Sequence, residues 1–361
     1  MNLWSKSSTR WSKQEYGLIV TSREFHMPAE WAEHERTWMA WPSSGYTLGE
    51  TEELANEARQ CWSNVANTIV RYEPVTVLVD PSALDEAQKW LDPQVEILEA
   101  KLDDAWMRDI GPTFVRDSSG KLAGVNWIFN GWGGQNWASW EHDSQAATAI
   151  LNSIGVERVD SPMTNEGGGI HVNGSRTIMI TETVQLDPGR NPDWTKEQVE
   201  AELQRTLGVD HVIWMPRGLT RDYDEFGTRG HIDIVACFAN EDTVLFHDQK
   251  NQDHPDYWIS QEVRRVLKGA RDSEGNKLNV ISVPAPETLQ DEEGWVDYSY
   301  INHYVCNGAV ILCAFDDAND EKAKKVLEKA YPGREVILVD ARPLFARGGG
   351  IHCITQQQPK A

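Results

Sequence analysis

The residues best suited to chemistry in this chain lie at the end of a repeated pentapeptide. Gly-Gly-Gly-Ile-His occurs at 167–171 and again at 348–352. The first copy is followed by Val172 and the second by Cys353, so the two copies differ by one nucleophile. A free cysteine attacks poorly until its thiolate forms, because its usual pKa is about 8.5. Cys353 is therefore the leading candidate for a catalytic thiol, in one copy of a duplicated structural unit.

A catalytic thiol needs a histidine to stabilise its thiolate and to carry protons to a leaving group. His231 is the candidate, within the sequence Arg-Gly-His-Ile-Asp-Ile at 229–234. If this segment is a strand, its alternation places His231 and Asp233 on the same side. A histidine in a β-like run is more often structural than catalytic, so this assignment depends on where the fold places it.

Further polar residues share one position in a repeated pattern. Pairs of β-like runs are separated by tight turns at 117–120, 173–174, 240–242 and 307–308, two of which are Asn-Gly. The residues that precede these pairs are Asp109, Glu166, His231 with Asp233, and Asn302. If the units pack around an axis, these positions converge at one end of a central channel.

Carboxylates around a cysteine and a histidine indicate what the substrate is. They would oppose the negative charge that develops in acyl transfer, so a protease is disfavoured. A guanidinium group, in contrast, carries five donors in a fixed fork that carboxylates bind bidentately. Asp109 and Asp233 would hold such a group with its central carbon facing the sulfur, and Glu166 would orient His231.

The segment Asp104–Pro112 offers two further residues beside Asp109. Trp106 would form an aromatic wall for an alkyl guanidine, although a core tryptophan is an equally good interpretation. Arg108 is expected to neutralise the neighbouring carboxylates of Asp103, Asp104 and Asp109.

The elements that would position these residues alternate between helix and strand. Apolar residues at helical spacing predict a helix over 54–69, and a short buried strand follows at 75–79. Thr195 and Gln198 predict a capping box for a helix that ends at Gly208.

A second helix, over 318–330, leads into a strand at 336–339. The repeating unit is strand, tight turn, strand, helix, strand, which predicts an α/β fold. We expect one catalytic domain over 27–361, preceded by a flexible extension at 1–26.

Composition limits the partners. The formal net charge is −22, which disfavours nucleic acid and anionic membranes but would attract a small cation. No run approaches 18 apolar residues, and the N-terminus lacks a signal-peptide core. The five cysteines form no CxxC pair, and Cys237, Cys306 and Cys313 lie in apolar runs. A cytoplasmic protein is expected, and a homo-oligomer stays open.

Metal and cofactor sites are not indicated. The histidines, acids and cysteines lack metal-ligand spacing such as HExxH. The glycine runs match neither a Walker loop nor a dinucleotide fingerprint. With a histidine at the end of each run, these glycines would instead allow close approach of the backbone to a site.

Eight segments in order resemble the agmatine deiminase family. It belongs to a guanidine-modifying superfamily that also contains arginine deiminases, amidinotransferases and bacterial peptidylarginine deiminases. The segments are MPAEWAEHERTWMAWP (27–42), DDAWMRDIGPTFV (103–115), NGWGG (130–134), EGGGIHVNG (166–174), RNPDWTKEQVE (190–200), GHID (230–233), FDDANDEKA (315–323) and GGGIHCITQQQP (348–359). The resemblance implies a five-bladed α/β propeller, the pentein fold, built from ββαβ units about a pseudo-fivefold axis.

The resemblance also implies residue roles and a reaction. The nucleophile corresponds to Cys353, the general acid and base to His231, and the histidine-orienting glutamate to Glu166. The guanidinium carboxylates correspond to Asp109 and Asp233, and Asn302 matches an asparagine near the substrate. The implied reaction is hydrolysis of agmatine to N-carbamoylputrescine and ammonia through a covalent thiouronium, a step of putrescine and polyamine biosynthesis. It needs no cofactor.

Three departures from the family pattern bear on the substrate. Gly350 stands where the family has asparagine, and Gly169 where it has serine. The loop before the catalytic histidine, usually Asp-Glu-Thr-Asn, here reads LTRDYDEFGTRG at 219–230. Asp222, Asp224 or Glu225 would pair with the amine tail of agmatine, whereas Arg221 or Arg229 would prefer a carboxylate tail.

Three functions therefore remain in competition. The first is a deiminase acting on agmatine, with free arginine or a C-terminal peptidyl arginine as alternative substrates. The second is an amidinotransferase that uses the same covalent intermediate. The third is a non-catalytic binding protein with the same fold, against which the complete set of functional residues argues.

Overall fold

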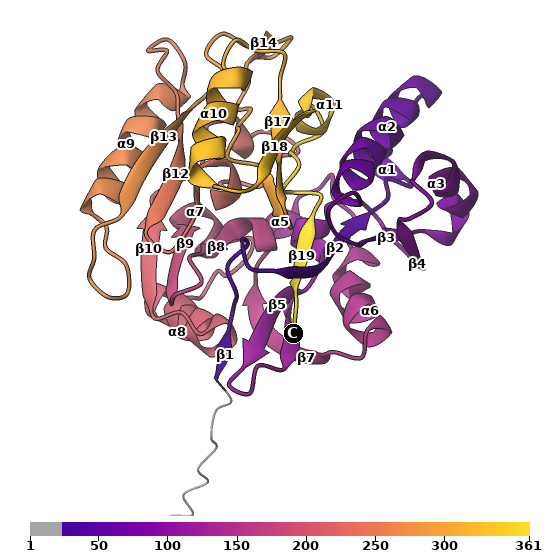
Figure 1. The fold of residues 1–361 in the computed structure, drawn as a ribbon, viewed down its shortest axis with the longest axis horizontal. Helices are drawn as coiled ribbons and strands as arrows, with labels where there is room; N and C mark the ends of the chain where they lie inside the picture. The colour runs from indigo at the N-terminus through magenta and orange to yellow at the C-terminus, as the bar shows by residue number, and fades with distance from the viewer. Residues whose placement is uncertain (1–23) are drawn as a thin grey trace, which may run out of the picture.

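The computed structural model describes residues 24–361 (Figure 1). The extension expected at 1–26 lies outside the described residues except for its last three. Of these, Phe25 and His26 form strand β1 (Phe25–His26), which pairs antiparallel with β5.

Five sheets repeat one pairing pattern, in which two antiparallel strands are followed by a third strand parallel to the second. Their strands are β5 (Thr113–Asp117), β6 (Leu122–Ile128) and β7 (Glu157–Thr164); β8 (Ile170–Val172), β9 (Thr177–Thr181) and β10 (His211–Met215); β11 (Ala236–Phe238), β12 (Thr243–Asp248) and β13 (Asn279–Pro284); β16 (Tyr304–Cys306), β17 (Ala309–Ala314) and β18 (Glu335–Asp340); and β19 (Gln356–Pro359), β2 (His34–Ala40) and β3 (Val75–Val79), extended by β4 (Glu96–Glu99). The last unit is completed by the C-terminal strand β19, which pairs with β2, so residues 356–359 and 34–40 share one sheet.

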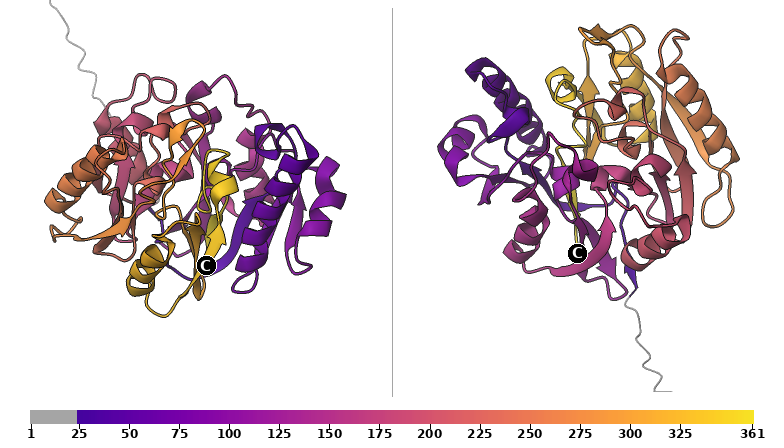
Figure 2. Two further views of the ribbon diagram at one scale, coloured as in Figure 1. Left: turned by 90° about the horizontal axis from the view of Figure 1, so that it is seen from above. Right: turned by 180° about the vertical axis from the view of Figure 1, so that it is seen from behind.

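A helix connects the second and third strands of each unit, as a parallel pair requires. These helices are α6 (Ala146–Ser153), α8 (Lys196–Leu207), α9 (Asp256–Gly269), α10 (Asp320–Ala330) and α2 (Glu52–Ile69). Figures 1 and 2 show them on the outside, with the sheets following one another around the centre of the molecule. The predicted unit of strand, turn, strand, helix and strand is confirmed.

The remaining elements are short and lie in the connections. They are α1 (Gly45–Leu48), α3 (Leu84–Trp90), α4 (Met107–Ile110), α5 (Gly131–Gly134), α7 (Glu182–Gln185), α11 (Arg342–Phe345), the β14 (Gln290–Asp291) and β15 (Gly294–Trp295) hairpin, and the 3₁₀ turns η1 (Pro81–Ala83), η2 (Asp143–Gln145), η3 (Gly167–Gly169), η4 (Arg221–Tyr223) and η5 (Ile232–Ile234).

Local sequence signals account for the regular elements. Thr195 and Gln198 form the predicted capping box of α8, and Gly208 ends that helix in the left-handed region at φ 72°. The Asn-Gly pairs at 173–174 and 307–308 join β8 to β9 and β16 to β17, as expected for hairpins.

The core is continuous through most of the units and is rich in tryptophan, with Trp38, Trp41 and Trp62 almost fully buried. Cys237, Cys306 and Cys313 are buried thiols, as predicted. None of the helices in residues 24–361 combines the length and the apolar character needed to cross a membrane.

Candidate active site

Each of the five units contributes one connection to the site. Asp109 lies in α4 before β5, Glu166 precedes η3 and β8, and Asn302 precedes β16. His231 and Asp233 flank the start of η5 before β11, and Cys353 precedes β19. The shared sequence position of these residues therefore corresponds to a shared place in the fold, and the structure brings them together.

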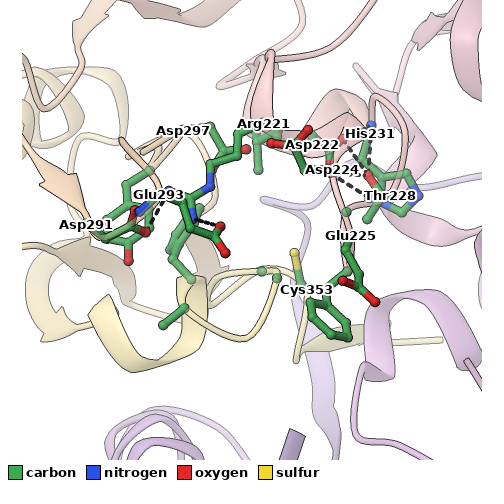
Figure 3. Close-up of a pocket in the computed structure, with 18 of the residues that line it drawn as sticks. Arg221, Asp222, Asp224, Glu225, Thr228, His231, Asp291, Glu293, Asp297 and Cys353 are labelled. Atoms are coloured by element: carbon green, nitrogen blue, oxygen red, sulfur yellow. Dashed lines mark hydrogen bonds and ion pairs between the residues drawn. The ribbon is translucent and has the colours of Figure 1, made fainter. Parts of the chain in front are cut away.

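His231, Asp233 and Cys353 line one cavity with a volume of about 500 Å³. Figure 3 shows the Cys353 sulfur in this cavity, with carboxylate side chains around it. His231 and Cys353, 122 positions apart in the sequence, thus reach the same cavity. Each lies in the segment that precedes the first strand of its unit.

Cys353 is buried and is held by two polar neighbours. Its Sγ lies 3.2 Å from Asn302 Nδ2 and 3.6 Å from Asp233 Oδ2. Burial raises the pKa of this thiol well above its usual value, and the carboxylates of Asp233 and Asp109 raise it further. The sulfur of the free site is therefore a thiol, and a cation bound beside it would favour the thiolate.

His231 is held by two acids. Its Nε2 lies 3.2 Å from Glu166 Oε2, and its Nδ1 lies 3.9 Å from Asp109 Oδ1. Burial opposes the charged ring, but Asp109, Glu166 and Asp233 outweigh it and raise the pKa of His231 to about 9. The ring is therefore an imidazolium at neutral pH, ready to act as a general acid.

Glu166 is kept ionised by a buried arginine. Arg190 Nε lies 3.0 Å from each Glu166 carboxylate oxygen, and both side chains are completely buried. Burial opposes ionisation of Glu166, but Arg190 and His231 overcome it and lower its pKa to about 2. The charge that orients His231 is therefore fixed.

The two carboxylates assigned to a guanidinium differ in their surroundings. Asp109 accepts hydrogen bonds from Gly168 N at 3.0 Å and from Trp132 Nε1 at 2.9 Å, yet burial raises its pKa to about 6. Asp233 accepts a hydrogen bond from His352 Nδ1 at 2.8 Å. Burial opposes its ionisation, but His352 outweighs burial and lowers the pKa of Asp233.

Among the described residues that line the cavity, four buried polar atoms have no hydrogen-bond partner: Tyr46 Oη, Arg221 Nη1, His231 Nδ1 and Asp233 Oδ1. Arg221 Nη1 is ion-paired with Asp291, and His231 Nδ1 and Asp233 Oδ1 belong to residues assigned to the reaction. Buried polar atoms are nearly always paired, so such exceptions in a cavity indicate atoms that meet a ligand. The carboxylate oxygen can accept from a guanidinium, and the protonated ring nitrogen can donate its proton to a substrate nitrogen once that nitrogen becomes basic.

Glycines are required where the backbone approaches these side chains. A Cβ at Gly168 would lie 2.5 Å from His231 Nδ1, and one at Gly349 would lie 3.1 Å from Cys353 Sγ and 2.7 Å from Trp106. Both glycine runs therefore allow close packing against the site, as the sequence suggested.

Some sequence predictions were wrong in detail. His231 and Asp233 do not alternate along a strand, because Ile232–Ile234 is the 3₁₀ turn η5 and β11 begins only at Ala236. Arg108 does not neutralise its acidic neighbours: its Nη1 pairs with Glu30 at 3.3 Å.

Trp106 packs beneath the site. Its ring stacks edge-on against Trp62 at 5.7 Å, and its Nε1 donates to Asp104 Oδ2 at 3.1 Å. It lies against Gly349 rather than among the described residues that line the cavity.

In the loop at 219–230, some charged side chains hold the local structure and others face the cavity. Asp222 accepts backbone hydrogen bonds from Gly230 and His231 and so supports the turn that carries His231. Arg229 pairs with Asp187 at 3.2 Å and is not among the described residues of the cavity wall. Asp224 and Glu225 line the cavity and are exposed.

Arg221 also lines the cavity, but its charge is already neutralised. It pairs with Asp291 at 2.6 Å and with Glu293 at 2.8 Å, both from the β14–β15 hairpin. Of the two arginines offered for a carboxylate tail, neither is therefore free of an acidic partner.

Sequence reasoning missed Trp132, Arg190 and His352 as functional residues. Trp132 and Arg190 lie in the segments NGWGG and RNPDW, which were visible as motifs but carried no chemistry of their own. His352 was visible as the residue before the nucleophile. Its contact with Asp233 joins residues 119 apart, which no local pattern reports.

Comparison with known proteins agrees with this geometry. Residues 26–359 match the sequence profile of the Porphyromonas-type peptidyl-arginine deiminase family. A Streptomyces coelicolor protein named "Putative agmatine deiminase" is 54% identical over 93% of this chain and 99% of its own. The agmatine deiminase of Stutzerimonas stutzeri is 38% identical over 95% and 98% of the two chains. The chain belongs to the agmatine deiminase family.

The fold of that family is also shared. The solved agmatine deiminase of Enterococcus faecalis superposes with a TM-score of 0.87 and 30% identity, over 93% of this chain and 96% of the other. The mixed α/β architecture described above is therefore that of an agmatine deiminase.

The glycine at position 350, one of the departures noted from the sequence, lies in a crowded place. A Cβ there would lie 2.5 Å from Asn302 Oδ1 and 2.6 Å from the Phe345 ring. Phe345 lines the cavity, so glycine at 350 leaves the space that this ring takes.

Proposed function

We propose that this protein is a hydrolase that deiminates agmatine to N-carbamoylputrescine and ammonia. The observation that carries the proposal is a cavity that joins a cysteine and a histidinium to an acidic wall. Eight of its lining residues are aspartate or glutamate, and one is arginine. A compound with a cation at each end suits such a cavity, and agmatine is named for the relatives that match almost the whole chain.

The proposed reaction begins with the guanidinium between Asp109 and Asp233. The positive charge of the guanidinium lowers the pKa of the Cys353 thiol, which releases its proton to solvent as the substrate binds. The thiolate then attacks the guanidinium carbon and forms a C–S bond. A tetrahedral intermediate results, in which the leaving nitrogen becomes basic.

His231 completes both halves of the cycle. Its imidazolium donates a proton to the leaving nitrogen of the tetrahedral intermediate, the C–N bond breaks, and ammonia departs, which leaves an S-alkylthiouronium on Cys353. The neutral ring then takes a proton from water, which attacks the same carbon. The C–S bond breaks, Cys353 is released, and the ureido product leaves. The sequence of steps needs no cofactor and no metal.

The tail of the substrate meets the outer wall of the cavity. Asp224, Glu225 and Glu292 line it, and none of them has an arginine or lysine within ion-pair distance among the described residues. Asp297 adds a carboxyl whose pKa is raised to about 8, first by burial and then by Asp222 and Asp256, so it is protonated in the free site and would ionise beside a bound ammonium. An ammonium would pair with these groups, whereas a carboxylate would be repelled.

A substrate panel that differs only in the tail tests the proposal. We expect kcat/KM for agmatine to exceed that for free arginine, and for a peptide ending in arginine, by about 100-fold, since two or three kcal/mol of charge repulsion is involved. Ammonia and ureido product would be followed with all three. Equal kcat/KM values would show that the enzyme does not distinguish the substrates by the charge of the tail. Absence of activity on all three would refute deimination. Turnover that required an added amine acceptor would instead indicate an amidinotransferase.

The pH dependence should report the proton that the free site must lose. In the free site Cys353 is a thiol and His231 is charged. Attack requires a thiolate, so the reactive form of the site carries one proton fewer than the free form. Because the pKa of His231 is raised to about 9, kcat/KM for agmatine should rise with pH through neutrality and level off near pH 9. Initial rates between pH 6 and 10 measure this. A plateau already reached at pH 7 would contradict it.

We also propose that the five units form a five-bladed propeller about a pseudo-fivefold axis, as a single domain over 27–361. The repeated sheet pairing and the contribution of one connection per unit to the site support this arrangement. The five unpaired cysteines are in keeping with a cytoplasmic location.

A further inference from the structure

The histidines of both Gly-Gly-Gly-Ile-His copies, His171 and His352, meet at one buried glutamate. His352 Nε2 lies 2.9 Å from Glu30 Oε1, and His171 Nε2 lies 3.5 Å from Glu30 Oε2. The two rings are 6.4 Å apart and nearly parallel. Glu30, in the connection between β1 and β2, is 5% exposed. The mechanism above uses none of these three residues.

Hydrogen bonding fixes the charge of each ring. Phe238 N donates to His171 Nδ1, so that nitrogen carries no proton and the ring of His171 is neutral, with its Nε2–H facing Glu30. His352 has a carboxylate at each nitrogen, Asp233 at Nδ1 and Glu30 at Nε2. Both of its nitrogens must donate, so His352 is an imidazolium.

A buried arginine completes the group. Arg108 Nη1 lies 3.3 Å from Glu30 Oε1, and its Nε donates to His352 O at 3.3 Å. Two anions, Glu30 and Asp233, then face two cations, His352 and Arg108. Burial is tolerated because the charges balance. His303 stays neutral near them, because burial lowers its pKa to about 4.

We propose that Glu30 is a positioning residue for the reaction: by holding the His352 imidazolium, it fixes the charge and the orientation of Asp233. With Oδ2 of Asp233 committed to His352, Oδ1 is the oxygen left to meet the guanidinium, and it is the atom without a partner. The two pentapeptide copies thus differ in use. His171 faces Glu30 as a neutral donor, whereas His352 is held by Glu30 as a cation and pairs with Asp233 in the site.

This inference rests on the proposed function, because Asp233 is assigned to the guanidinium there. The variant Glu30→Gln removes the charge and keeps the shape. We expect KM for agmatine to rise about 10-fold while kcat changes by less than about 3-fold, because Asp233 binds the substrate and does not transfer a proton. Glu73→Gln is the matched control. Glu73 is an equally buried glutamate that pairs with a histidine, His34, at 3.0 Å, and does not contact Asp233.

A second measurement does not depend on turnover. In protein labelled with ¹⁵N-histidine, both ring nitrogens of His352 should have imidazolium shifts at pH 8, assigned by their loss in His352→Gln. In Glu30→Gln one of them should shift to the neutral range, and in Glu73→Gln neither should. If Glu30→Gln fails to fold, Glu30→Asp, which withdraws the carboxylate by one methylene, takes its place with the same expectations.

The outcomes separate the two proposals. A neutral His352 in the unaltered protein would overturn the positioning role, and so would a Glu30→Gln variant whose KM matches that of Glu73→Gln; deimination would stand in both cases. Unaltered protein that does not act on agmatine would overturn the proposed function, and this inference with it.

Discussion

Replacement of Cys353 by serine is expected to reduce turnover of agmatine by about 10⁴-fold or more, as loss of a nucleophile does in other covalent mechanisms. A serine hydroxyl has a much higher pKa than a thiol, and the site lacks a base strong enough to remove its proton, because His231 is already protonated. The guanidinium would still bind between Asp109 and Asp233. Binding should therefore survive while the C–S bond cannot form.

Cys61→Ser is the control for this experiment. Cys61 is buried to a similar degree, and burial raises the pKa of its thiol to about 12, but it lies in α2, away from the cavity. Steady-state ammonia release and mass spectrometry of acid-quenched protein would be compared. The unaltered protein and Cys61→Ser should show the thiouronium adduct, and Cys353→Ser should not. Turnover of Cys353→Ser within 10-fold of the unaltered protein would exclude Cys353 as the nucleophile.

The repeated position of polar residues was the most informative sequence signal. Hairpins and helix caps are set by local chemistry, as at Asn173-Gly174 and at the Thr195 capping box, so their places could be predicted. Once those elements repeat in phase, residues such as Asp109 and Glu166 must occupy equivalent connections. The structure shows the same for Cys353 in the unit that the C-terminal strand completes.

The conformation at His231 could not be predicted from its own segment. Alternating apolar residues at 230–235 are compatible with a strand, yet the chain turns there. Asp222, eight residues earlier, accepts the N–H groups of Gly230 and His231, and Gly230 has φ 115°, which glycine adopts without strain. The turn is thus specified by a neighbouring loop rather than by local propensity.

Ion pairs between residues of different units could not be predicted from the sequence either. Arg108 stands next to Asp109 in the sequence, so local neutralisation was the natural expectation. In the fold, Glu30 approaches Arg108 from another unit, and two further histidines share that glutamate. Long-range charge balance of this kind depends on which connections meet at the centre, and the sequence pattern gives the connections but not the pairs.

Asp109→Asn should separate activity from stability. Asparagine keeps the shape of the side chain, but its single oxygen can accept from only one of Gly168 N and Trp132 Nε1, which Asp109 meets with separate oxygens. It cannot offer a negative charge to the guanidinium or to His231. We expect kcat/KM for agmatine to fall by about 10²- to 10³-fold, the scale on which one preorganised electrostatic contact acts.

The stability of Asp109→Asn, compared with that of the unaltered protein, should improve as the pH rises. Burial raises the pKa of Asp109 to about 6, above its usual 3.8, so the stability that the protonated form contributes is present below about pH 4 and is lost as the pH rises through 6. Asparagine does not ionise and escapes this loss. The melting temperature of Asp109→Asn, relative to that of the unaltered protein, should therefore increase between pH 5 and pH 8.

Asp143→Asn distinguishes a catalytic carboxylate from one that is merely buried. Asp143 is 1% exposed, and burial raises its pKa well above the usual range, with Asp104 and Asp103 raising it further; it accepts a hydrogen bond from Asp103 N and does not line the cavity. Both variants should gain relative stability with rising pH, measured by thermal unfolding at pH 5 and pH 8. Only Asp109→Asn should lose turnover. Parallel losses of rate and melting temperature in Asp109→Asn would mean that its carboxylate supports the fold rather than the substrate.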